Sequence, residues 1–370
     1  MVFEEKVHNI HLHSTFKVPV RESVEIFKRE FEETGTDKVC FLSIPTHGAS
    51  RNDDLQNLKT LYYKLAFSPK AYAFAGLEYD LSLDKDLLAK ELLIQAETAY
   101  RVGFDGFKML EGVPSLRKFL GFELCDEVYE PFYSFMEEKG LPIVMHLAHP
   151  KVFWDAEKLS EYWKNRGCLY DETFPSFKAL HEEVFRIMEK HPNLKLILAH
   201  LGFWGDDLDE AKRFLSYPNT GLDLTPGGEQ FFAMLENGKE STLAFFREFN
   251  DRLYFGTDMY NFEYDGEKSW KTAIHNRPDF VCNFLSTDTE HYYIKESDKY
   301  TGIGLEKKYR DKIYRENFEK LLKEPRKIDL DYCIKKTEFY AIKEPQGTLR
   351  EYDLKCMKWD FNELKNSEAK

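Results

Sequence analysis

Short apolar segments alternate along the chain with longer segments in which apolar residues recur at helical spacing. The short segments are rich in β-branched and aromatic residues and are predicted to be strands. Eight strands are predicted, at residues 7–13, 38–44, 71–79, 104–110, 141–148, 194–202, 220–225 and 252–259. Several of the helical segments that follow them begin with acidic residues and stop at Gly or Pro. Eight strand-then-helix units in succession predict a (β/α)₈ barrel, a closed parallel sheet inside a ring of helices.

Two connections in this repeat are too long to be simple turns: residues 149–175 after the fifth strand and residues 260–303 after the eighth. Both are rich in aromatic residues, and connections longer than about 15 residues usually carry a function or are disordered. We expect them to be ordered caps over the face of the barrel where the strands end. The barrel is expected to occupy residues 1–326. A charged C-terminal extension, residues 327–370, is expected to pack outside the barrel or to form a subunit contact.

Composition narrows the class of partner. Hydrophobic residues make up 42% of the chain and aromatic residues 15%, so a large core can be buried. The formal net charge is -13 and no block of Lys and Arg stands out, which argues against nucleic acid or an anionic membrane as the partner. The expected partner is therefore a small molecule, with a homodimer left open.

Targeting signals and cysteine pairs are not apparent in the sequence. The N-terminus has no basic segment followed by an apolar one, and no apolar run approaches the roughly 18 residues of a membrane span. Six cysteines are scattered without a Cys-x-x-Cys pair, which favours free thiols. A cytoplasmic protein is expected.

Polar residues with catalytic chemistry lie at the ends of five predicted strands. In a (β/α)₈ barrel the active site is built at the C-terminal ends of the strands, so these residues would meet at the mouth. They are His11 and His13 in the first strand, Lys108 in the fourth, His146 in the fifth, His200 in the sixth and Asp258 in the eighth.

The spacing of the first pair predicts a metal site. Residues two apart on a strand face the same side, so His11 and His13 would face the barrel interior and Leu12 the helices. Unpaired imidazoles are costly in an apolar interior, whereas zinc binds His nitrogen and carboxylate oxygen and leaves a position for water. In the fifth strand His149 follows three residues after His146 and would face the opposite side. His146 is therefore the preferred interior ligand.

Several segments together resemble the amidohydrolase superfamily. They are the His-x-His of the first strand, "FKML", "PIVMHLAHP", "LKLILAHLGFWGDDL", "YFGTDM" and the closing "IYRENFEKLL". Within the superfamily the chain is most similar to the amidohydrolase-related branch, which contains aminocarboxymuconate semialdehyde decarboxylase and related hydrolases and decarboxylases. The resemblance spans roughly residues 7–323. One departure is Phe318 after "REN", where the branch commonly has Asn-Ala; it concerns helix packing only.

The resemblance implies a set of roles. His11, His13, His146 and Asp258 would bind one divalent metal ion, most often zinc, and His200 would stand near the metal-bound water and move its proton. Asp258 could serve both as ligand and as proton acceptor. In other branches a lysine at the fourth strand is carboxylated and bridges two metal ions, so a second metal with a carboxylated Lys108 stays open. In the resembled branch that lysine is unmodified.

The expected activity is metal-dependent hydrolysis of an amide, ester or lactone in a small molecule. A bound metal lowers the pKa of water from about 15.7 to about 7, which supplies hydroxide at neutral pH. The alternative is non-oxidative decarboxylation of an aromatic or unsaturated carboxylic acid, and a non-catalytic binding barrel is a third hypothesis. Candidate substrate contacts are Lys108, Trp204 and Arg51. Trp204 could form a wall of the pocket or be ordinary packing, and Arg51 could clamp a substrate carboxylate or form a surface ion pair.

Overall fold

The structure is a computed structural model that describes residues 5–13, 18–45, 54–226, 230–260, 266–293 and 298–368, without the side chains of residues 260 and 266–275. One parallel sheet of nine strands forms its centre, in the order β8-β7-β6-β5-β4-β3-β2-β1-β9. The strands are β1 (Val7–His13), β2 (Thr36–Leu42), β3 (Ala71–Gly76), β4 (Gly106–Gly112), β5 (Ile143–Leu147), β6 (Leu196–Leu198), β7 (Thr220–Asp223), β8 (Leu253–Tyr254) and β9 (Met259–Tyr260).

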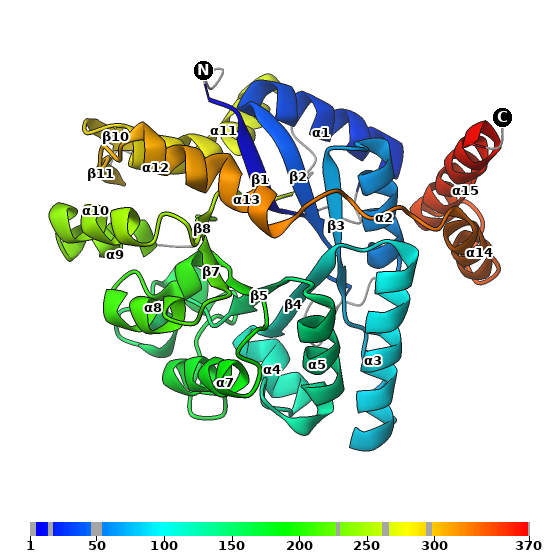
Figure 1. Cartoon of the computed structure of the whole chain (residues 1–370), viewed down its shortest axis with the longest axis horizontal. Coiled ribbons are helices and arrows are strands. Elements are labelled where there is room, and N and C mark those ends of the chain that lie inside the picture. The colour runs from blue at the N-terminus through cyan, green and yellow to red at the C-terminus, as the bar shows by residue number, and fades with distance from the viewer. Residues whose placement is uncertain are drawn as a thin grey trace.

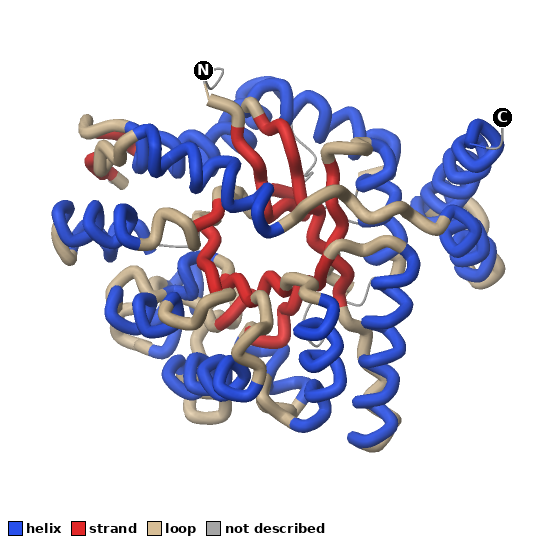
Figure 2. The backbone as a smooth tube through the Cα atoms, in the orientation of Figure 1, coloured by secondary structure: helices blue, strands red, loops and turns tan. Residues whose placement is uncertain are grey.

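The sheet closes on itself through the eighth predicted strand, which the structure divides into β8 and β9. β8 pairs with β7, and β9 pairs with β1 through Leu12 and Met259. Between them the Ile10 N–H donates to the Phe255 carbonyl at 3.0 Å. Figure 2 shows the resulting ring of strands inside a layer of helices. The predicted (β/α)₈ barrel is confirmed.

Helices follow the strands around the ring (Figure 1). Asp84 begins α3 by accepting a hydrogen bond from the Leu87 N–H, and Gly103 ends it in the left-handed conformation. The helices of the repeat are α1 (Val20–Thr34), α2 (Gln56–Ala66), α3 (Lys85–Val102), α4 (Pro114–Leu120), α5 (Glu130–Lys139), α7 (Phe177–Lys190), α8 (Leu208–Leu215), α9 (Gln230–Glu236), α10 (Lys239–Glu248), α12 (Lys307–Asp311) and α13 (Asn317–Leu321).

Two apolar layers hold the barrel together. A large cluster packs the outer faces of the strands against the helices, and Leu12 belongs to it. A smaller cluster fills the barrel interior and is closed by Phe318 and Leu322 of the α13 region. Its strand members are Ile10, Cys40, Leu42, Tyr72, Phe74, Val144, Ile197 and Tyr254. Because apolar side chains fill the interior, the polar residues of the mouth rest on a packed floor.

Both long connections have secondary structure of their own. The first carries a 3₁₀ helix (Lys151–Trp154) and α6 (Glu161–Lys164) around a small apolar cluster that includes Phe153 and Tyr170. The second carries α11 (Gly266–Ser286) and an antiparallel hairpin of β10 (Glu290–Tyr292) and β11 (Lys299–Thr301).

The C-terminal extension is a pair of helices, α14 (Leu330–Ala341) and α15 (Leu349–Glu368), on the side of the molecule opposite α10 and α12 (Figure 1). Asp353 of α15 is fully buried, 3.0 Å from the Lys59 Nζ and 2.9 Å from the Val20 N–H. The extension therefore packs on α1 and α2, although the domain boundary at residue 326 stays a prediction. In the described part of the chain no helix is both long and apolar enough to cross a membrane.

Candidate metal site

A bulge in β1 brings His11 and His13 to the barrel mouth. Asn9 pairs with Val39 of β2 and Leu12 pairs with Phe41, so three steps along β1 match two along β2. The extra residue lets Ile10 join the interior floor while the next residue, His11, also faces inward. Asn9 supports the bulge, since its Oδ1 accepts the His11 N–H at 3.0 Å.

Hydrogen bonds fix the tautomers of the two imidazoles. The Nδ1 of His11 lies 2.7 Å from Asp223 Oδ2, and the Nδ1 of His13 lies 2.8 Å from the Leu42 carbonyl oxygen. These oxygens can only accept, so each Nδ1 carries the proton and each Nε2 presents a lone pair. Burial lowers the pKa of both imidazoles well below 6.5, so both are neutral at pH 7. The two Nε2 atoms are only 3.0 Å apart.

Asp258 completes a group of three ligand atoms that lie within 4.8 Å of one another. Its Oδ1 is 3.5 Å from the His11 Nε2 and 3.4 Å from the His13 Nε2. Burial alone would raise the pKa of Asp258, but the nearby positive charge of Arg277, with that of Lys108, outweighs it and holds the pKa below its usual value. Two lone pairs and a carboxylate oxygen therefore converge on one point, which suits a divalent cation.

His146 stands beside this group and outside its 4.8 Å limit. Its Nε2 is buried and has no hydrogen-bond partner among the residues that the structure describes. Such a nitrogen costs about 1–3 kcal/mol, so a metal bond would remove a penalty that the fold otherwise carries. The alternative, His149, does not face the opposite side as expected, because β5 ends at Leu147 and the His149 ring centroid lies 5.2 Å from that of His146. Its Nδ1 lies 2.5 Å from the Tyr170 hydroxyl.

His200 faces the group from the end of β6. Its ring centroid lies 4.8 Å from that of His146 and 5.5 Å from that of His11. The Nδ1 lies 3.3 Å from the Thr225 carbonyl oxygen, so it carries the proton and the Nε2 presents the lone pair. Burial lowers the pKa of His200 to about 4, which leaves a neutral proton acceptor at pH 7.

The backbone is strained at the strand ends that carry these residues. Ala148, His200, Leu201, Phe203 and Asp258 all have φ between 51° and 61°, although none is glycine. Left-handed backbone is unfavourable for residues with a side chain, and such strain is found mainly at functional sites. The strain adds to the evidence that the mouth is the functional end of the barrel.

Lys108 lies inside the same cluster. Its Nζ is 3.2 Å from the His11 Nε2, and burial lowers its pKa to about 8. A cation thus already sits against one of the two lone pairs. Carboxylation of Lys108, a second metal ion and a substrate contact all stay predictions.

The other two predicted substrate contacts lie elsewhere. Arg51 falls outside the described residues. Trp204 is 2% exposed and packs against His181, Phe185 and Phe214 of α7 and α8. Its contacts are those of core packing between barrel and helices, and a substrate contact by Trp204 stays a prediction.

Sequence reasoning missed Asp223, at the end of β7. Its side chain is fully buried; Oδ2 accepts from the His11 Nδ1–H and Oδ1 accepts from the His200 N–H at 2.9 Å. It therefore orients residues from two strands. A single Asp within the apolar segment "TGLDLT" was the available signal, because Asp is rarely buried without a specific partner.

Arg277, in α11, was also missed. Its Nη1 lies 3.1 Å from Asp258 Oδ2 and 3.2 Å from the Thr257 carbonyl oxygen, and it also contacts the Asp258 carbonyl oxygen. No sequence signal places it there, because the path of a long connection cannot be deduced from its periodicity.

A (β/α)₈ barrel with buried imidazoles and a carboxylate at its mouth has the architecture of a barrel enzyme. The chain belongs to the amidohydrolase family, whose family model matches residues 82–323, more than half of the sequence. The resemblance found in the sequence motifs is thereby confirmed. No curated protein sequence matches the chain.

Solved structures share the fold at low sequence identity. An amidohydrolase II aligns over 85% of this chain and 99% of its own, with 11% identity and a TM-score of 0.52. The apo form of IDCase from Metarhizium anisopliae aligns over 86% and 97%, with 13% identity and a TM-score of 0.51. A Polaromonas dihydroxybenzoic acid decarboxylase with bound manganese aligns over 85% and 96%, with 18% identity and a TM-score of 0.45. The first two similarities show the fold alone.

Proposed function

We propose that this protein is a metal-dependent hydrolase that binds one divalent cation between His11, His13, His146 and Asp258. The observation that carries the proposal is the pair of Nε2 lone pairs that face each other at 3.0 Å. Neutral lone pairs at that distance repel, and the Lys108 ammonium lies against only the one on His11, so a cation shared by both nitrogens would remove the repulsion. Zinc suits a donor set of imidazole and carboxylate and is the ion that we propose.

The residues around the cation site support hydrolysis of a carbonyl-type centre. When bound, the metal acidifies water and polarises a carbonyl group. His200 is neutral at pH 7, and its proton is on the Nδ1, which lies against the Thr225 carbonyl oxygen. The Nε2 can therefore accept the proton that water loses. The salt bridge to Arg277 keeps Asp258 ionised and makes it a weak base, which leaves His200 as the better proton acceptor.

Decarboxylation of a carboxylic acid is the second candidate. Two cationic side chains, Lys108 and Arg277, flank the ligand group, and either favours a substrate that carries a carboxylate. The two activities differ in their products, since decarboxylation releases CO₂ and hydrolysis consumes water.

Metal analysis tests the proposal first. Elemental analysis of the purified protein should find about one equivalent of divalent metal per chain, and the double variant His11→Ala/His13→Ala should lose it. His191→Ala, at the end of α7 where its imidazole contacts Glu130 and Glu137, is the matched control and should keep the metal. A folded double variant that holds one equivalent would end the proposal.

A substrate screen then separates the two activities. Carboxylic acids, lactones, amides and esters are offered to the metal-loaded protein, and products are identified by mass spectrometry. His200→Asn should suppress turnover by about 100-fold or more while the metal content is unchanged, because the residue is assigned to proton transfer. Loss of metal in that variant would make His200 a ligand instead.

A further inference from the structure

We infer that Arg277 is a positioning residue that commits Asp258 to the metal through one oxygen only. The inference rests on the proposed function and extends it to a side chain from outside the barrel strands. Arg277 lies in α11, within the long connection that follows β9.

The two carboxylate oxygens of Asp258 have different neighbours. Oδ1 faces the Nε2 atoms of His11 and His13, at 3.5 Å and 3.4 Å, while Oδ2 accepts from the Arg277 Nη1 at 3.1 Å. A guanidinium on one oxygen fixes the rotation of the carboxylate and leaves the other oxygen aimed at the imidazoles. Without it, the carboxylate could rotate or offer both oxygens to the cation.

The same guanidinium holds the backbone on which this carboxylate depends. Arg277 Nη1 contacts the carbonyl oxygens of Thr257 and Asp258. Asp258 has φ of 51°, a conformation that persists only where the surroundings enforce it. From the other side the Asp258 N–H donates to the His11 carbonyl at 2.8 Å. Arg277 and β1 therefore fix the strained residue together.

Arg277 is itself anchored by the β10–β11 hairpin. The hydroxyl of Tyr293, next to β10, lies close enough to Arg277 for the guanidinium to lower its pKa against the effect of burial, and the Tyr293 ring packs on Phe280 of α11 with centroids 4.3 Å apart. The Arg277 side chain is 32% exposed, so its salt bridge is not an isolated surface pair whose loss would go unnoticed. A chain of contacts thus runs from the hairpin through Arg277 to the candidate ligand.

Metal affinity of the purified protein tests the inference without a substrate. Apo protein is titrated with Zn²⁺ in competition with a chromophoric chelator, for the wild type, Arg277→Met, Arg277→Lys and Tyr293→Phe. Loss of a group that orients a ligand typically weakens metal binding 10–100-fold, so Arg277→Met should fall by about that factor. Arg277→Lys keeps the positive charge but lacks the planar guanidinium, so its Zn²⁺ affinity should lie between those of the wild type and Arg277→Met. Tyr293→Phe should lose less affinity than Arg277→Met.

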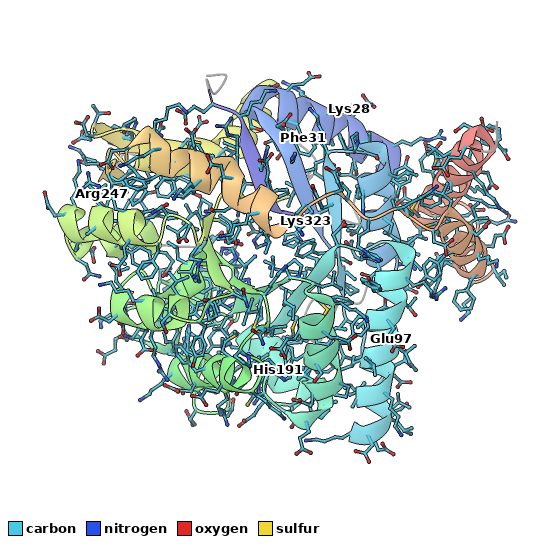
Figure 3. The ribbon with its side chains drawn as sticks, viewed as in Figure 1. Lys28, Phe31, Glu97, His191, Arg247 and Lys323 are labelled. Atoms are coloured by element: carbon cyan, nitrogen blue, oxygen red, sulfur yellow. The ribbon has the colours of Figure 1, made fainter. Side chains whose placement is uncertain are left out.

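Arg247→Met is the matched control. Arg247 lies in α10 at the edge of the molecule, where it pairs with Glu306 at 2.8 Å (Figure 3). Its replacement should leave the affinity within twofold of the wild type. The visible spectrum of the Co²⁺-loaded protein adds a readout of ligand geometry, and Arg277→Met should change that spectrum while Arg247→Met should not.

The outcomes separate the two proposals. A wild-type protein that binds no metal would refute the proposed function itself. The inference alone would be overturned if the wild type binds one equivalent of metal and Arg277→Met has the same affinity and the same Co²⁺ spectrum. The same result for the milder Arg277→Lys would also overturn it. If Arg277→Met does not fold, the graded losses expected for Arg277→Lys and Tyr293→Phe decide the question.

Discussion

The proton positions on His11 and His13 follow from groups that never touch the proposed metal. The Asp223 carboxylate and the Leu42 carbonyl accept from the two Nδ1 atoms, and this leaves both Nε2 atoms as lone pairs. One partner is a side chain and the other is backbone, so only the first can be changed by mutation. The dependence of the two imidazoles on Asp223 is therefore open to a direct test.

Asp223→Asn should weaken metal binding by about 10–100-fold with the stoichiometry unchanged. The amide keeps the shape but loses the charge, and it brings N–H groups toward the donors that surround it, namely the His11 Nδ1–H and the His200 N–H. Competition with a chelator measures the loss. Asp209→Asn, at a side chain 95% exposed, is the control and should bind as the wild type does. Unchanged affinity in Asp223→Asn would show that Asp223 does not set the tautomer.

Acid should destabilise the metal-free protein through His200. Its pKa is about 4 in the folded state and about 6.5 in an unfolded chain, so the unfolded chain binds the extra proton between these values. Its contribution is complete above pH 6.5 and is lost as pH falls toward 4, by roughly 2 kcal/mol at pH 5. Urea unfolding at pH 7.5 and pH 5 should show the wild type losing that much more than His200→Asn. Equal losses would contradict the burial assigned to this imidazole.

At the scale of elements, the sequence pattern located most strands and helices because burial repeats with a fixed period. The first strand shows where the pattern stops being informative. Strict alternation placed His11 and His13 inward, which the structure bears out, but it gave no sign of the bulge that also turns Ile10 inward. A bulge depends on pairing with β2 and on Asn9, and neither is visible in the period of one segment.

The last predicted strand and its connection show a second limit. Residues 252–259 have one continuous strand pattern, yet the structure pairs β8 with β7 and β9 with β1. The division is set by closure of the barrel, a property of the whole sheet. The role of Arg277 could not be predicted for the same reason, since tertiary packing brings α11 to Asp258.

Helix α1 carries a buried carboxylic acid, Glu30, whose ionisation should make the stability of the protein depend on pH. Glu30 is 2% exposed, its Oε2 has no hydrogen-bond partner among the described residues, and burial raises its pKa to about 8. The folded state keeps a proton that the unfolded chain releases above about pH 4.5, so this contribution is lost as pH rises to 8.

Glu30→Gln should remove the loss of stability that ionisation of Glu30 causes as the pH rises. Between pH 7 and pH 9 the variant should gain roughly 1 kcal/mol of unfolding free energy relative to the wild type, because the amide stays neutral. Urea denaturation at the two pH values measures the difference, with the exposed Glu32→Gln on the same helix as control. The prediction would be wrong if the unfolding free energies of the wild type and Glu30→Gln changed equally between pH 7 and pH 9.

At the scale of the whole molecule, the extension is tied to the barrel by buried charge. Lys59 and Asp353 are 1% and 0% exposed and lie 3.0 Å apart, and Asp360 of α15 adds contacts to Arg21 at 2.6 Å and Tyr62 at 2.7 Å. The sequence pattern did not assign helices here, because the period of this segment is weak. The expected small-molecule partner and the homodimer stay predictions.

Asp353→Ala should destabilise the protein by about 3–5 kcal/mol, because the Lys59 ammonium would remain buried without its partner. The double variant Lys59→Met/Asp353→Leu should recover part of that loss. Asp331→Ala, at an exposed pair with Lys365 in the same helix pair, should change stability by less than about 1 kcal/mol. Chemical unfolding measures all three, and a small effect of Asp353→Ala would mean that the extension is not coupled to the barrel through this pair.

The left-handed backbone at Ala148 and Leu201 has a consequence for how this protein can evolve. Each non-glycine residue in that conformation costs about 1 kcal/mol, which a glycine would release. At Leu201, which is buried in the core, a glycine would lose more through the cavity it leaves than it gains from the backbone. Selection for thermal tolerance alone should therefore enrich glycine only at Ala148, two residues after His146. Selection for turnover should resist that change, since a more mobile backbone would fix the orientation of the His146 imidazole less well.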